Sequence, residues 1–126
     1  MVCIREDKIV INDYIENDPL SEENLDKTLE TVDRFRLLFP NKSIWIYSGY
    51  TWNQVMNPVI TDDFNPSRDE IFHKRKEIIK QCDVMVDGRY IDSQRNPSKK
   101  WAGSDNQRVI SIQESIKQGK VVLYCD

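Results

Sequence analysis

The stretch SIWIY (Ser43–Tyr47) is apolar at successive positions, which is typical of a β-strand that is covered on both faces. Ser48-Gly49 follows and is expected to end the strand, because such residues favour turns. Two other short apolar runs, DVMV (Asp83–Val86) and VVLY (Val121–Tyr124), predict buried strands of the same kind. The run KIVINDYI (Lys8–Ile15) alternates more loosely and predicts a shorter strand.

Segments with helical spacing separate these strands. Ser21 is the expected N-cap of the first helix, and Pro40 is expected to stop it. Two capping-box patterns, Ser67–Glu70 and Ser111–Glu114, predict the starts of two more helices, and Gly119 is expected to end the last one. The apolar residues that give the first helix its spacing are Leu25, Leu29, Val32 and Phe35.

Strands that alternate with helices predict an α/β fold, a parallel sheet built from βα units. Both an open doubly wound sheet and a partial (βα) barrel agree with this order. A chain of 126 residues has the size of one domain, so residues 1–126 are interpreted as a single unit. Residues after the carboxyl ends of parallel strands converge in either architecture, so Ser48-Gly49-Tyr50 and Asp87-Gly88-Arg89 are predicted to be neighbours.

The composition excludes several classes of protein. A net charge of -3 argues against a general nucleic-acid binder, which needs a basic excess. No apolar run approaches the roughly 20 residues that span a bilayer, and the first residues are charged, so we expect a cytoplasmic protein without a membrane partner. Cys3, Cys82 and Cys125 lack the spacing of metal ligands and are expected to be free buried thiols, with no metal bound.

Two strand ends carry candidate binding residues. Asp87 and Arg89 can provide a hydroxyl acceptor beside an anion clamp, or they form a surface turn with a weak ion pair. Ser48, Gly49 and Tyr50 offer a hydroxyl and a backbone that a ligand can approach closely, or they form a simple strand-to-helix turn. Under the first reading, all five residues are candidates for contact with a cofactor.

The stretch from Gly88 to Arg108 is basic, with five basic residues against two acidic ones. Its last part, WAGSDNQR (Trp101–Arg108), can present N–H groups and a guanidinium to a carboxylate or phosphate. The same loop can instead be a solvated connection whose amide side chains bind backbone. Under the first alternative the residues that bind an anion or a partner are Asn106, Gln107, Arg108, Lys99 and Lys100.

Several of these motifs together resemble a known family. The segments that carry the resemblance are Asp18-Pro19-Leu20, FPNK (39–42), IWIYSGYT (44–51), DVMVDGR (83–89) and GSDNQR (103–108). In this order they are similar to about the C-terminal two thirds of the activating protein of anaerobic (class III) ribonucleoside-triphosphate reductase. The resemblance runs from about Ile15 to Asp126.

This resemblance implies a radical S-adenosylmethionine enzyme on a partial (βα) barrel. In that family an N-terminal CxxxCxxC loop holds a four-iron, four-sulfur cluster that binds S-adenosylmethionine. One electron from the cluster cleaves a C–S bond of S-adenosylmethionine, and the 5'-deoxyadenosyl radical that forms takes a hydrogen from a glycine of the reductase. The implied partner is therefore the anaerobic reductase. The implied contacts with cofactor or partner fall on Ser48, Gly49, Tyr50, Asp87, Arg89 and Asn106–Arg108.

The chain departs from the family at two motifs. It has no CxxxCxxC, and Glu16-Asn17 stands where the family has Gly-Gly before the acidic residue and Pro. We therefore expect no cluster in this chain alone and a truncated protein, or one that is inactive alone. Two alternatives are a non-catalytic module that docks on the reductase or on a full-length activating protein, and an α/β domain with another function such as small-anion binding.

Overall fold

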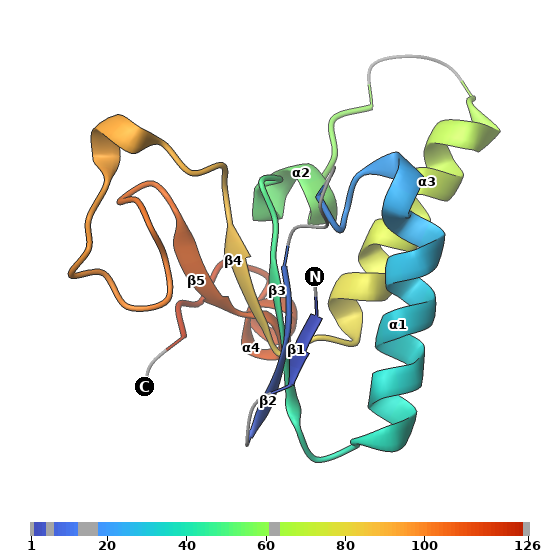
Figure 1. The fold of residues 1–126 in the computed structure, drawn as a ribbon. Coiled ribbons are helices and arrows are strands. Elements are labelled where there is room, and N and C mark those ends of the chain that lie inside the picture. The colour runs from blue at the N-terminus through green and yellow to red at the C-terminus, as the bar shows by residue number, and fades with distance from the viewer. Residues whose placement is uncertain (1, 5–6, 13–17, 61–63, 125–126) are drawn as a thin grey trace.

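The computed structural model describes residues 2–4, 7–12, 18–60 and 64–124 (Figure 1). Within these ranges the strands form one sheet, and their order across the sheet is their order along the chain. SIWIY forms the predicted strand over its whole length. The strands are β1 (Val2–Ile4), β2 (Lys8–Ile11), β3 (Ser43–Tyr47), β4 (Val84–Asp87) and β5 (Arg108–Ser111).

The three central strands β2, β3 and β4 are parallel, and both edge strands are antiparallel to their neighbours. The prediction of a parallel sheet is therefore correct for the centre and wrong for the edges. A parallel pair needs a crossover of a dozen or more residues, and the few residues between β1 and β2 cannot provide one. The long connection between β4 and β5 contains no α-helix. It turns back at the end of the sheet where β4 finishes, so β5 runs antiparallel to β4.

The helices are α1 (Leu25–Leu38), α2 (Trp52–Met56), α3 (Pro66–Lys80) and α4 (Ile112–Gln118), with short 3-10 turns at Glu22–Asn24 and Asp92–Gln94. Figure 1 shows α1 and α3 side by side on one side of the sheet. The units β2-α1-β3 and β3-α2-α3-β4 confirm the α/β class and agree with a partial βα fold. None of the helices in these ranges has the length and apolar character needed to cross a membrane.

Neither of the two predicted capping boxes forms in the structure. Asn65, not Ser67, caps α3, and its side-chain oxygen accepts a hydrogen bond from Arg68 N at 3.1 Å. Pro66 explains the earlier start, because proline suits the first helical position. Ser111 precedes α4 as predicted but makes no side-chain cap bond. Gly119 ends this helix in the left-handed region (φ 68°), as predicted.

The predicted strand VVLY does not form. Its residues make only an isolated bridge, between Leu123 and Ile110. Ser111 N donates to Val122 O and Tyr124 N donates to Val109 O, both at 2.8 Å. This segment therefore covers the free edge of β5 without becoming a sixth strand.

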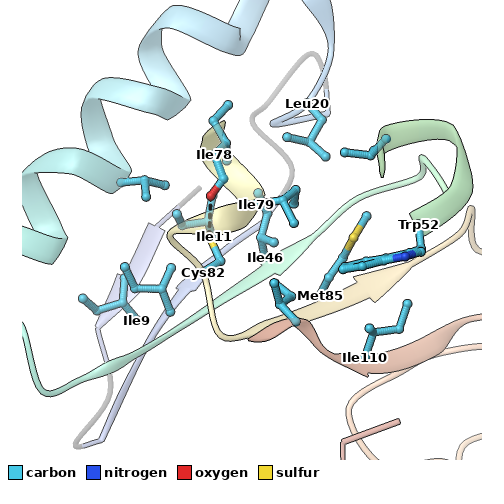
Figure 2. Close-up of a cluster of buried hydrophobic side chains, with 14 of the residues drawn as sticks. Ile9, Ile11, Leu20, Ile46, Trp52, Ile78, Ile79, Cys82, Met85 and Ile110 are labelled. Carbon is cyan, nitrogen blue, oxygen red and sulfur yellow. Dashed lines mark hydrogen bonds between the residues drawn. The ribbon is translucent and has the colours of Figure 1, made fainter. Parts of the chain in front are cut away.

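The hydrophobic core lies between the sheet and helices α1 and α3 (Figure 2). Alternate residues of neighbouring strands meet in register on this face, and the row Ile11, Ile46, Met85 and Ile110 is fully buried. Cys82 lies in the same core, and its Sγ donates to Ile78 O at 3.3 Å. Cys82 is thus the free buried thiol that was predicted, whereas the side chains of Cys3 and Cys125 lie outside the described part of the chain.

The opposite face of the sheet is also covered. Trp45 is only 3% exposed, because Trp101 and Tyr124 pack against it edge to face with ring centroids 5.1 Å away. The Lys8 Nζ lies 4.1 Å from the centroid of the Trp45 ring, a cation–π contact. Burial of β3 on both faces, predicted from its apolar sequence, is confirmed.

Candidate functional site

A cavity of about 1100 Å³ opens at the carboxyl ends of β2, β3 and β4. Small-molecule sites in known proteins measure roughly 300–1,000 Å³, so this cavity is slightly larger than a typical one. Its walls come mainly from residues 47–51 at the end of β3, 86–91 at the end of β4 and 106–108 at the start of β5. Eight of the ten candidate residues line it, and Lys99 and Lys100 do not.

At the end of β3 the polar groups are occupied by Asp18. The Ser48 hydroxyl donates to Asp18 Oδ1 at 2.8 Å, and Gly49 N donates to Asp18 Oδ2. Leu20 N also donates to Asp18 Oδ1, at 2.9 Å. A Cβ on Gly49 would lie 3.2 Å from Asp18 Oδ2, so glycine gives the carboxylate room. Asp18 is a cavity residue that the residue pattern did not single out, and its only signal was its place in the motif Asp18-Pro19-Leu20.

At the end of β4 the Asp87 carboxylate is buried, with 1% of the residue exposed. Its Oδ1 accepts from Arg108 N and Nε, each at 3.2 Å. Its Oδ2 accepts from Arg108 Nη2 at 2.7 Å and from Trp52 N, at the start of α2, at 2.9 Å. These four bonds use the four lone-pair directions of a carboxylate. The alternative of an ion pair between Asp87 and Arg89 is therefore wrong, and the acceptor positions that were suggested for a ligand hydroxyl are filled by groups of the protein.

The Asp87 carboxylate raises the pKa of the Arg108 guanidinium by hydrogen bonding, and this outweighs the opposite effect of partial burial. Arg108 remains a cation with 39% of its side chain exposed on the cavity wall. Arg89, which also lines the cavity, is exposed, and its guanidinium has no hydrogen bond or ion pair to any residue that the structure describes. Among the described residues, Arg89 is thus a cavity-lining cation whose guanidinium has no partner.

The amides of Asn106 and Gln107 bind backbone instead of facing the cavity as free groups. Asn106 Nδ2 donates to Arg89 O at 2.8 Å, and Gln107 Nε2 donates to Gly88 O at 3.1 Å. Lys99 Nζ donates to Asp105 O at 3.0 Å, away from the cavity. The alternative of a loop whose amides satisfy backbone therefore describes this segment.

Two aromatic residues complete the walls of the cavity. The Arg75 guanidinium of α3 lies 4.4 Å from the centroid of the Tyr50 ring, donates to Tyr50 Oη at 3.2 Å and donates to Leu20 O at 2.8 Å. Tyr90 is 47% exposed. Its pKa is raised by partial burial and by the hydrogen bond to Asp92. Nothing in the sequence around Arg75 distinguished it from the other charged residues of its helix.

The described residues do not fit an iron–sulfur cluster. No group of three His, Cys, Asp or Glu side chains in these ranges could hold a metal ion. Burial raises the pKa of the Cys82 thiol, which disfavours the thiolate that metal binding needs. Cys3 and Cys125 as side chains, and Glu16-Asn17 at the position of the family's glycines, lie outside the part of the chain that is described.

A cavity at the carboxyl ends of the strands is where α/β proteins usually bind their ligands, so fold and cavity are those of an α/β ligand-binding protein. Comparison with known proteins identifies the family. Residues 16–110 match the family described as a 4Fe-4S single cluster domain, so the chain belongs to that family. Its curated relatives carry the name anaerobic ribonucleoside-triphosphate reductase-activating protein, which confirms the resemblance seen in the sequence.

The relatives match most of this chain but only part of their own length. The protein of Vibrio cholerae is 32% identical over 90 residues, 71% of this chain and 48% of the relative. Those of Escherichia coli K12 and Enterobacteria phage T4 are 30% identical over 92 residues and 31% identical over 100 residues, covering 73% and 79% of this chain and 49% and 51% of the relatives. The chain thus spans about half the length of these relatives. No solved structure matches it at a significant level.

Proposed function

We propose that this chain acts as an anaerobic ribonucleoside-triphosphate reductase-activating protein-like domain that binds S-adenosylmethionine in the cavity at the strand ends. The observation that carries the proposal is that the motifs IWIYSGYT and DVMVDGR end in the cavity walls, where the Arg89 guanidinium has no partner among the described residues. In the family, S-adenosylmethionine supplies the 5'-deoxyadenosyl group for radical formation. We propose the anaerobic reductase as the partner, in line with the printed name of the relatives.

The chain's own residues suggest how such a ligand is held. Arg89 would pair with the methionine carboxylate, because a guanidinium binds a carboxylate through two parallel hydrogen bonds. Tyr90, partly exposed at the wall, offers an aromatic face to the adenine. Asp18 and Asp87 bind groups of the protein and hold the two strand ends in place.

Cluster chemistry enters no step of this proposal, because the described residues do not fit a cluster. We propose that the chain alone does not generate a radical and that cysteine ligands from outside the described residues are needed. Anaerobic reconstitution with iron and sulfide tests this part. Uptake of about four irons per chain, as in a [4Fe–4S] protein, would contradict it.

Calorimetric titration with S-adenosylmethionine tests the binding site. Arg89→Ala is expected to weaken binding about tenfold, which corresponds to about 1.4 kcal/mol. Arg95→Ala is the matched control, because Arg95 is an exposed arginine of the same basic stretch that does not line the cavity. Absence of binding to the unmodified chain, or equal losses in both variants, would refute the assignment.

A second candidate function is a non-catalytic module that docks on the reductase or on a full-length activating protein. The observation in its favour is the excursion between β4 and β5, residues 91–104, which projects from the sheet in Figure 1 and is mostly exposed. Backbone bonds Asn96 N to Gly103 O (3.0 Å) and Asp105 N to Gln94 O (2.9 Å) hold it in one shape. Lys99 and Lys100 lie on this excursion, outside the cavity.

Capture on immobilised reductase distinguishes this second function. The double variant Lys99→Glu/Lys100→Glu is expected to lose capture, because it reverses two charges on the excursion. Lys117→Glu/Lys120→Glu makes the same charge change at exposed residues at the end of α4 and serves as the control. Undiminished capture of the first variant would exclude the excursion as the interface.

A further inference from the structure

We propose that Asn106 and Gln107 are positioning residues that hold the backbone of Gly88 and Arg89 and thereby direct the Arg89 guanidinium into the cavity. The proposal rests on the proposed role of Arg89 in binding the cofactor and adds two residues that act through it. In this proposal neither amide contacts the ligand directly.

The first support is the register of the sheet. The antiparallel ladder between β4 and β5 ends at the pair Asp87 and Arg108. The next residues continue the same pairing through side chains, because Gln107 donates to Gly88 O (3.1 Å) and Asn106 donates to Arg89 O (2.8 Å). The side-chain amides thus extend the ladder by two residues beyond its last backbone pair.

The second support is that both amides are themselves fixed. Gln107 Oε1 accepts from Gly103 N at 2.8 Å and from Ser104 N at 3.1 Å. Asn106 Oδ1 accepts from the Ser104 hydroxyl at 2.6 Å, and that hydroxyl accepts from Ile91 N at 3.2 Å. The oxygen and one N–H of each amide are therefore engaged, which restricts the rotamer of the side chain and the carbonyl it binds.

The third support is the backbone conformation that needs to be held. Gly88 has φ 92°, a conformation that side-chain-bearing residues rarely adopt, so the chain turns sharply between the buried Asp87 and the exposed Arg89. Glycine is also the most freely rotating residue, so without the two amide bonds this peptide has few other restraints. One other restraint is the bond from Gly88 N to Tyr50 O, at 3.3 Å.

The decisive test is a double-mutant cycle on the affinity for S-adenosylmethionine. Gln107→Glu keeps an acceptor for Gly103 and Ser104 but replaces the donor to Gly88 O with an oxygen. We expect a loss of affinity of about fivefold, within the range of coupled neighbours. Gln94→Glu, the matched control on the same excursion, adds the same charge without a contact to Gly88 or Arg89 among the described residues and is expected to change nothing.

Combining Gln107→Glu with Arg89→Ala shows whether Gln107 acts on affinity through Arg89. In Arg89→Ala, the further change Gln107→Glu is expected to have no additional effect. A direct electrostatic effect on the ligand would persist in that background, and its persistence would overturn the proposal, as would full affinity of the single variant. Asn106→Asp, which removes the donor to Arg89 O, is a second variant with the same expectations.

An NMR measurement on the ligand-free protein tests this inference separately from the proposed function. The ¹⁵N heteronuclear NOE of the Gly88 and Arg89 amides is expected to fall in Gln107→Glu and to stay unchanged in Gln94→Glu. If S-adenosylmethionine does not bind the unmodified chain, the proposed function fails, and the NOE still decides whether the amides hold this backbone. Unchanged NOE values in Gln107→Glu would refute the inference even where Arg89→Ala weakens binding.

Discussion

Replacing Asp87 by asparagine tests the contact on which the end of β4 depends. The carboxylate accepts four hydrogen bonds, from Trp52 N and from three nitrogens of Arg108, and is 1% exposed. An asparagine oxygen can keep at most two of these bonds, and its NH₂ group faces the remaining donors. The variant therefore loses two bonds of the charge-assisted kind, each contributing about 1.5–3 kcal/mol.

Solvent reduces this sum. Because 39% of the Arg108 side chain is exposed, water can rehydrate part of its guanidinium in the variant, and we expect a net loss of about 3 kcal/mol. In a chain of this length that lowers Tm by about 10 °C. Urea unfolding followed by tryptophan fluorescence measures the difference, because Trp52 is buried beside the altered carboxylate.

Asp92→Asn is the control for this experiment. Asp92 lies on the excursion after the same strand and is exposed, so its loss should change the free energy of unfolding by no more than about 0.5 kcal/mol. If Asp87→Asn changes the free energy of unfolding as little as Asp92→Asn does, Asp87 is not a structural anchor and the reasoning is refuted.

Three further predictions concern single residues. Gly88→Ala should lower stability by about 1–2 kcal/mol in urea unfolding, because φ is 92° there; an unchanged midpoint would contradict the left-handed conformation. Gly49→Ala should weaken the Asp18 contact, since its Cβ would lie 3.2 Å from Asp18 Oδ2, and faster proteolysis of the segment that begins at Asp18 than in the unmodified chain would show it. Burial raises the pKa of Cys82 above its ordinary 9.0, so the folded chain keeps the thiol protonated while the unfolded chain ionises above that pH. Stability should therefore fall by about 1.4 kcal/mol per pH unit above pH 9 in the unmodified chain, and unfolding curves of Cys82→Ala that show the same slope would contradict this account.

The central strands could be predicted from sequence because their burial is written in consecutive apolar residues. β3 and β4 follow SIWIY and DVMV closely, with β4 displaced by one residue. The direction of the edge strands could not be predicted in this way, since it depends on how the connections return. VVLY has the same composition as a strand, but it makes only one bridge to β5.

The location of the site could be predicted from the sequence, but the hydrogen bonds within it could not. The rule that strand ends converge brings Tyr50 and Gly88 together, and the structure joins them by a backbone bond of 3.3 Å. The partners of the carboxylates were beyond the sequence, because Asp87 pairs with a residue 21 positions later and Asp18 with one 30 positions later. Charge and spacing suggested Arg89 for Asp87, since a neighbour in sequence is easier to infer than a neighbour in space.

The excursion between β4 and β5 leaves and rejoins the sheet at one point, where Asn106 and Gln107 bind the residues that begin it. Because the two ends of the excursion are held together, residues at its tip are suitable for inserting a foreign peptide. An epitope or a fluorescent label inserted between Pro97 and Ser98, both exposed, should be displayed to solvent while the cavity at the base keeps its shape. A fluorescent label at this position would then report ligand binding in the cavity from outside the cavity.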